Sequence, residues 1–168
     1  MDVSPATTQI VVIGVGNDFR RDDGVGWAVV AGLADRAARR PLPDGTRLTR
    51  TDGEPTRLIS AWEDARLAIV VDAAHAHPAR PGRVHRLPLD GGPPRTPRDT
   101  NSSHGFALGD TVRLARTLDR LPGQLLVYAV EAADTSPGTG LSPQVAAAVG
   151  PLVQRIQEDL VHHARADE

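Results

Sequence analysis

The 168-residue sequence contains neither cysteine nor lysine, and each absence excludes a class of chemistry. Without cysteine the chain cannot form disulfides, thiolate metal sites or a cysteine nucleophile, which is compatible with a reducing compartment. Without lysine it cannot form a Schiff base or use the lysine of a P-loop to bind phosphate. The chain therefore has to bind ligands and perform chemistry with its other side chains.

The sequence also lacks a strong charge excess and a long apolar run. The net charge of −2 at pH 7 gives no electrostatic footprint for nucleic acid. No apolar run is long enough to cross a bilayer, and residues 1–8 lack the basic and apolar regions of a signal peptide. We expect one domain over residues 1–168, with a loose tail over 1–8, that is cytoplasmic and binds neither nucleic acid nor membrane.

Short apolar runs alternate with amphipathic runs along the chain, which predicts an α/β fold. The expected strands cover residues 10–15, 47–51, 67–72, 82–89 and 124–130, and the expected helices cover residues 23–40, 56–64, about 108–121 and 143–160. Pro88 favours an edge position for the strand that contains it. We expect a single three-layer domain with a mainly parallel, twisted sheet of about five strands and helices on both faces.

A glycine-rich segment with two adjacent carboxylates follows the first expected strand and precedes an amphipathic helix. It reads GVGNDFRRDDGVG over residues 14–26. Glycines allow tight turns and close approach of the backbone. Phe19 stands where a dinucleotide-binding fingerprint requires its third glycine, which argues against pyrophosphate binding. We interpret Asp22 as the N-cap of the helix and Asp23 as the side chain available to a ligand.

Three polar side chains stand where expected strands and loops end. Asp23 follows the first strand, Asp72 ends the strand over 67–72, and His104 closes the polar segment 90–103. In open α/β sheets the carboxyl ends of the strands form one edge, so all three could face the same crevice. Two carboxylates and an imidazole suit a divalent cation such as nickel or zinc. The spacing alone leaves capping or solvated roles open for each of them.

The remaining histidines and the standard catalytic signatures give no further candidate. We interpret His75 and His77 as part of an exposed polar loop, and His162 and His163 as solvated side chains. The chain has no Gly-x-Ser-x-Gly nucleophile elbow and no His-Glu-x-x-His zinc motif. If the protein is a hydrolase, its nucleophile is therefore not a standard one.

Several segments, taken in order, resemble the [NiFe]-hydrogenase maturation proteases. The matching segments are residues 12–26, 69–73, 81–84, 103–108 and 140–145. Together they extend the resemblance roughly from Gln9 to His162, which is nearly the whole chain. The glycine-rich segment is the most specific of them, and the others gain weight from their order.

The resemblance implies an aspartyl-type endopeptidase that removes the C-terminal extension of a [NiFe]-hydrogenase large-subunit precursor after nickel is installed. The family's metal-binding and catalytic positions fall on Asp23, Asp72 and His104. The resemblance further implies that the substrate carries the nickel, for which zinc or cadmium could substitute in a crystal. It also implies a protease that is monomeric before it meets the precursor.

The mechanism and two rival functions stay open at this point. The nickel could polarise the scissile carbonyl or activate water, or it could only dock the substrate while Asp23 or Asp72 acts as a base. The polar segment 90–103 is our candidate for gripping the precursor. The rival functions are a non-hydrolytic, metal-dependent hydrogenase assembly factor and a small-ligand or nucleotide-binding α/β domain.

Overall fold

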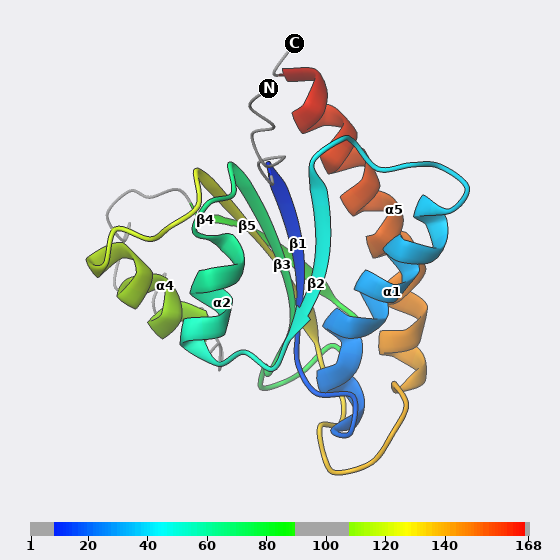
Figure 1. The fold of residues 1–168 in the computed structure, drawn as a ribbon. Coiled ribbons are helices and arrows are strands. Elements are labelled where there is room, and N and C mark those ends of the chain that lie inside the picture. The colour runs from blue at the N-terminus through cyan, green and yellow to red at the C-terminus, as the bar shows by residue number, and fades with distance from the viewer. Residues whose placement is uncertain (1–8, 90–107, 167–168) are drawn as a thin grey trace, which may run out of the picture.

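The computed structural model of the chain describes residues 9–89 and 108–166. Its elements, in chain order, are β1 (Ile10–Val15), the 3-10 helix η1 (Arg21–Gly24), α1 (Val25–Ala37), β2 (Thr46–Thr51), α2 (Pro55–Trp62), β3 (Leu67–Ala74), β4 (Val84–Leu89), α4 (Leu108–Thr117), β5 (Gln124–Glu131) and α5 (Pro143–Ala166). Figure 1 shows a central sheet with α1 and α5 on one face and α2 and α4 on the other. The predicted three-layer α/β fold is confirmed.

The sheet has five strands in the order β2-β1-β3-β5-β4. β1 pairs in parallel with both β2 and β3, and β3 pairs in parallel with β5. β4 is antiparallel to β5 and forms one edge of the sheet. Pro88 lies in this edge strand, as its missing N–H predicts, because an edge strand has one side without ladder hydrogen bonds.

The core consists of two apolar layers, one on each side of the sheet. All residues of β1 are buried, and successive side chains alternate between the layers. Ile10 and Val12 pack toward α1 and α5, whereas Val11 and Ile13 pack toward α2 and α4. A continuous apolar run, rather than an alternating one, is what a parallel strand covered on both faces requires.

Helix α1 begins in direct contact with the sheet because its second residue is glycine. A Cβ atom on Gly26 would lie 2.4 Å from the carbonyl oxygen of Val71 and 2.7 Å from that of Val15. Such distances are far inside van der Waals contact, so only glycine allows the helix to approach β1 and β3 this closely. This packing brings η1, with its two aspartates, next to the end of β3.

Several element boundaries differ from the sequence prediction, and two of these differences bear on the site. The helix expected over residues 23–40 is divided into η1 and α1, so Asp22 and Asp23 lie in a 3-10 turn rather than at the start of an α-helix. β3 continues to Ala74, so Asp72 lies inside the strand and not at its end. The extension occurs because Ala73 and Ala74 pair with Val130 and Glu131 of β5.

Across residues 9–89 and 108–166, no helix is both long and apolar enough to cross a bilayer. The longest helix, α5, buries one face against the sheet and leaves charged side chains on the other. The expected loose tail over residues 1–8 and the segment 90–103 lie outside the described residues.

Candidate active site

A small pocket opens at the carboxyl ends of β1, β2 and β3, where an open α/β sheet is expected to carry its site. Its volume is about 170 Å³. It is lined by Val15, Gly16, Asp23, Asp52, Gly53, Leu58, Asp72, Ala73, His75, Leu108 and Thr111. Two of the three predicted site residues, Asp23 and Asp72, therefore lie in the same pocket.

Asp23 is placed by a tight loop that closes on itself. The Asn17 N–H donates to the backbone oxygen of Asp23 at 3.2 Å. A Cβ atom on Gly16 would lie 1.8 Å from that same oxygen, and Gly16 has a φ of +146°. Only glycine fits there, so the glycine of the motif serves to place an acid rather than to cradle a phosphate.

The electrostatic surroundings of Asp23 act in opposite directions. Burial raises the pKa of its carboxyl group, while the charges of Arg20 and His75 partly counteract that effect. The net result is a pKa above the ordinary value. A carboxylate in this position gains from any cation that enters the pocket, because the cation offsets the cost of burying the charge.

Asp72 is the more strongly perturbed carboxyl group. Burial raises its pKa to about 7, and the nearby charge of Asp23 acts in the same direction. The Ala73 N–H donates to Asp72 Oδ1 at 2.8 Å and opposes the shift without reversing it. A carboxyl group with a pKa near 7 exists in both protonation states at neutral pH, which suits it to accept and return a proton.

Asp22 is not the N-cap that the sequence suggested. Its side chain is fully buried and accepts hydrogen bonds from the N–H groups of Ala133 (2.9 Å) and Asp134 (3.0 Å). It also accepts from the Ser142 N–H at 2.7 Å and from the Ser142 hydroxyl at 2.9 Å. Helix α1 instead begins with Gly24 at its N-cap. Asp22 thus holds the loop between β5 and α5 against the loop that carries Asp23.

These hydrogen bonds account for the charge state of Asp22. Burial disfavours the ionised carboxylate, but the hydrogen bonds from Ser142, Asp134 and Ala133 outweigh it and hold the pKa below its ordinary value. Asp22 is therefore ionised at neutral pH and fully occupied by protein donors, whereas its neighbour Asp23 faces the pocket. The two adjacent aspartates have separate tasks.

His75 belongs to the pocket, although the sequence indicated only an exposed polar loop. Its side chain is exposed, yet it forms part of the pocket wall together with Asp23 and Asp72. The cause is the extension of β3 to Ala74, which places His75 at the carboxyl end of the sheet. A strand boundary drawn two residues further along the chain would have identified it.

A buried carboxylate anchors the segment that follows His75. Glu131, the last residue of β5, accepts hydrogen bonds from the Arg80 N–H at 3.1 Å and from His85 Nε2 at 2.8 Å. Burial disfavours its charge, but these contacts outweigh burial and hold the pKa of Glu131 below its ordinary value. The segment that leaves the pocket is therefore tied to β5 at its far end.

Asp52 and Gly53, which the sequence assigned to a turn, also line the pocket. The Asp52 carboxylate accepts from the Glu54 N–H at 3.1 Å and pairs with Arg57 at 2.6 Å. These contacts, the Glu54 hydrogen bond first, hold the pKa of Asp52 below its ordinary value. Asp52 is thus already engaged by its own loop, which leaves Asp23, Asp72 and His75 as the groups available to a ligand.

The third predicted ligand, His104, lies outside the described residues, so the structure does not place it. Within residues 9–89 and 108–166, no three histidine, aspartate or glutamate side chains are grouped closely enough to hold a metal ion. The described part of the pocket therefore supplies two carboxylates of the predicted ligand set.

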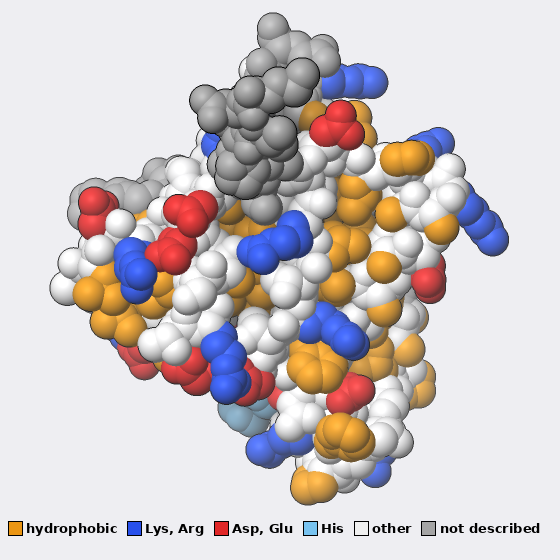
Figure 2. Space-filling model, viewed as in Figure 1, with side chains coloured by type: hydrophobic (Ala, Val, Ile, Leu, Met, Phe, Trp, Pro, Cys, Tyr) orange, Lys and Arg blue, Asp and Glu red, His pale blue; other side chains and the backbone are white. Residues whose placement is uncertain are grey.

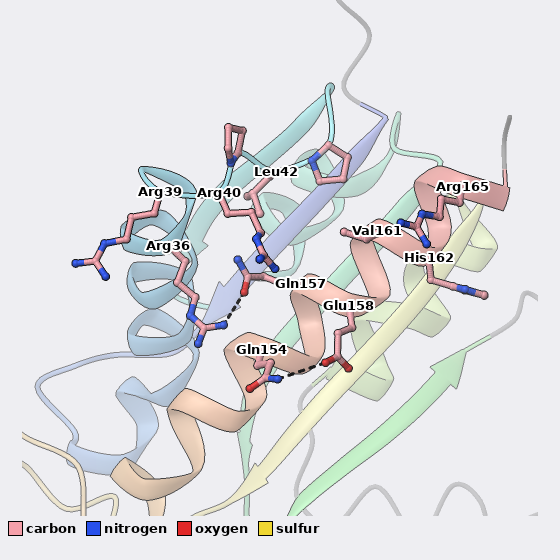
Figure 3. Close-up of a pocket in the computed structure, with 12 residues that line it drawn as sticks. Arg36, Arg39, Arg40, Leu42, Gln154, Gln157, Glu158, Val161, His162 and Arg165 are labelled. Atoms are coloured by element: carbon pink, nitrogen blue, oxygen red, sulfur yellow. Dashed lines mark hydrogen bonds between the residues drawn. The ribbon is translucent and has the colours of Figure 1, made fainter.

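A larger cavity, of about 680 Å³, lies at the opposite end of the sheet, where the chain leaves α1 and enters β2. Figure 3 shows that its walls come from the end of α1, the following loop and the second half of α5. Four of its twelve lining residues are arginines, and a hydrogen bond from Arg36 to Gln157 at 2.6 Å crosses it. Of the histidines weighed in the sequence, only His162 lines it. This cavity is remote from the predicted site residues.

The fold and the pocket define a three-layer α/β protein in which two carboxylates meet at the carboxyl ends of adjacent parallel strands. A family model described as hydrogenase maturation protease matches residues 51–159. The Hydrogenase 2 maturation protease of Escherichia coli (strain K12) is 26% identical over 148 residues, which cover 88% of this chain and 88% of that protein.

Two solved structures agree with this match. The E. coli hydrogenase maturating endopeptidase HybD shares the fold with a TM-score of 0.72 and 22% identity, over 92% of this chain and 93% of that chain. A hydrogenase 2 maturation peptidase from a Thaumarchaeota archaeon has a TM-score of 0.64 and 26% identity, over 90% of this chain and 97% of that chain. The chain belongs to the hydrogenase maturation protease family, and its activity is that of a peptidase.

Proposed function

We propose that this protein is an aspartyl-type endopeptidase that removes the C-terminal extension of a [NiFe]-hydrogenase large-subunit precursor after nickel is installed. The observation that carries the proposal is the meeting of Asp23 and Asp72 in one pocket at the carboxyl ends of β1 and β3. The family membership supplies the class of substrate. The proposal includes a cytoplasmic location and a monomeric protease before the precursor binds.

The donor set fits a nickel ion that arrives as part of the substrate. Two carboxylates share a small pocket, and burial, together with the charge of Asp23, raises the pKa of Asp72, so a cation bound between them would offset the cost of burying the pair. His104 would complete the set as an imidazole ligand. Oxygen and nitrogen ligands with open positions suit nickel that other groups on the precursor already hold. When bound there, nickel would supply a positive charge able to polarise the scissile carbonyl or a water molecule.

The chain's own groups can position the substrate and move a proton. If nickel only docks the substrate and Asp72 does not bind it, the Asp72 carboxyl group, with its pKa of about 7, is suited to take a proton from water during attack on the peptide bond. His75, at the wall of the same pocket, is suited to donate a proton to the amine that leaves, after which the proton held by Asp72 passes through solvent back to His75. Asp22 keeps the Asp23 loop fixed through its four hydrogen bonds, so the reacting groups do not have to be ordered when the substrate binds.

The substitution Asp72→Asn tests the proposal and separates the two roles of this residue. A nickel-loaded precursor is incubated with the wild-type chain or the variant, and mass spectrometry measures loss of the extension. We expect wild-type cleavage and a loss of at least a hundredfold in the variant. Full processing by the variant would contradict both a ligand role and a base role for Asp72.

Binding measurements on the same variant then distinguish the two roles. If Asp72 is a ligand, the variant loses the preference for nickel-loaded over nickel-free precursor. If Asp72 is a base, the variant binds the nickel-loaded precursor as the wild type does and fails only to cut it. A matched substitution, Asp35→Asn on the exposed side of α1, should change neither measurement.

A further inference from the structure

Phe19 is the most exposed large apolar side chain among the described residues. It is 70% exposed, compared with 50% for Leu118, which is the next. Figure 2 shows hydrophobic side chains projecting at the lower right end of the molecule, where Figure 1 places the β1–α1 and β5–α5 loops. A phenylalanine in this state contributes almost nothing to the core, and its ring is open to contact by a partner.

The backbone on which Phe19 stands is tightly held. Its carbonyl oxygen accepts the Gly138 N–H at 2.8 Å, and its own N–H donates to Asn17 Oδ1 at 2.9 Å. The Arg21 N–H donates in turn to the Gly138 oxygen at 3.1 Å, and Arg20 forms a β-bridge with Gly138. An exposed aromatic ring on an ordered backbone loses little entropy when a partner covers it.

The β5–α5 loop makes further hydrogen bonds to the residues that follow Phe19. The Asp22 carboxylate binds that loop at Ala133, Asp134 and Ser142, and Arg20 Nε donates to the Thr135 oxygen at 3.2 Å. The two loops therefore behave as one unit. Two ordered loops that present a single uncovered aromatic side chain have the features of a binding hot spot.

Phe19 also has a fixed relation to the pocket. It lies four residues before Asp23, and the Asp23 N–H donates to the Arg20 oxygen at 3.1 Å. The Asn17 N–H closes the other side of the loop on the Asp23 oxygen at 3.2 Å. One side of the loop thus places Asp23 in the pocket while its apex carries the phenylalanine ring, so a partner bound to the ring is held in register with the carboxylates.

We propose that Phe19 is a docking residue that inserts into an apolar depression on the folded body of the hydrogenase large-subunit precursor. This inference rests on the proposed function. A protease that cuts one bond in a folded protein needs contacts outside the cleavage pocket, and a pocket of about 170 Å³ cannot hold more than the segment being cut. The phenylalanine supplies such a contact and sets the distance between the bound precursor and the carboxylates of the pocket.

Steady-state cleavage of the nickel-loaded precursor by Phe19→Ala tests the inference. We expect KM to rise about tenfold or more while kcat stays within about twofold, because the ring binds the precursor but does not touch the reacting bond. Phe19→Leu, which keeps an apolar side chain, should recover most of the loss. Leu118→Ala, which removes an exposed apolar side chain beyond the far end of α4, should leave both constants unchanged.

The outcomes separate this inference from the function on which it rests. A wild-type chain that leaves the precursor intact overturns the proposed function, and the docking role with it. A wild-type chain that cleaves beside a Phe19→Ala variant of equal KM overturns the docking role alone. Light scattering gives a second check, because a wild-type dimer that the substitution converts to monomer would assign the ring to a second copy of this chain instead.

Discussion

The carboxylate of Asp22 accepts two hydrogen bonds from Ser142, a residue 120 positions further along the chain. The N–H contact is 2.7 Å and the hydroxyl contact is 2.9 Å. These bonds join the first loop of the molecule to the start of its last helix. They explain why an aspartate stands directly before the one that faces the pocket.

The first prediction concerns the stability that this contact supplies. Asp22→Ala removes a fully buried carboxylate that accepts from three N–H groups and one hydroxyl, so it should lower the free energy of unfolding by about 2–4 kcal/mol. In a protein of this size that corresponds to a fall in Tm of roughly 4–16 °C. Differential scanning calorimetry measures it, with Asp35→Ala as the exposed control. An unchanged Tm for Asp22→Ala would show that the hydrogen bonds are not needed.

The same residue predicts that the protein loses stability at acidic pH. The folded-state pKa of Asp22 lies below its ordinary value of 3.8, so its contribution is present above that value and is lost as the pH falls through the lower, folded pKa. The wild-type Tm should therefore decline more steeply below about pH 4 than the Tm of Asp22→Asn. Parallel slopes for the two proteins would contradict this assignment.

Asp72 predicts the opposite dependence of stability on pH. Its folded-state pKa of about 7 exceeds the ordinary 3.8, so the folded protein binds the proton more tightly, and stability increases as the pH falls from about 8 toward 4. Asp72→Asn carries no charge at this position, and it should be more stable than the wild type at pH 8 by several degrees in Tm. The difference should vanish near pH 4. A less stable variant at pH 8 would show that the ionised carboxylate is well accommodated.

A third position, Gly16, predicts the cost of displacing Asp23. Gly16→Ala would place a Cβ atom 1.8 Å from the Asp23 backbone oxygen at a φ of +146°, so the loop must move. We expect a lower Tm and a loss of cleavage of at least tenfold. Gly150→Ala is the matched control, because nothing lies within 4 Å of a Cβ there and the position is inside α5. It should raise stability by about 0.5–1 kcal/mol and leave cleavage unchanged.

The two histidines after β3 give a paired prediction. His75 lines the pocket, whereas His77, two residues further along the chain, does not. His75→Gln should lower kcat by about tenfold or more, as removal of a proton donor would. His77→Gln should behave as the wild type. Equal effects of the two substitutions would assign His75 to the loop rather than to the reaction.

The fold could be predicted from the sequence because its strands are continuous apolar runs between amphipathic helices. Val11, Val12 and Ile13 need cover on both sides, and only a parallel sheet with two helical layers provides it. Pro88 correctly indicated the edge. These features could be predicted because each depends on the residue types within one segment and not on contacts between distant residues.

The details of the pocket depended on contacts that a sequence does not display. Asp22 and Asp23 are chemically identical neighbours, and only the donors on Ala133, Asp134 and Ser142 show which one is buried. The sequence predicts a loop at His75 because the expected strand ends on Asp72, and Ala73 and Ala74 have little strand propensity to extend it. Their pairing with β5 extends β3 and moves the histidine to the pocket.

The tie between Asp22 and Ser142 has a consequence for the synthesis of the protein. The loop that carries Asp23 is translated first, and its anchoring donors on residues 133–142 are added only about 110 residues later. A nascent or truncated chain that stops before residue 133 retains the pocket carboxylates but not the donors that hold their loop in place. The protease therefore acquires an ordered site only once the chain through residue 142 has been synthesised.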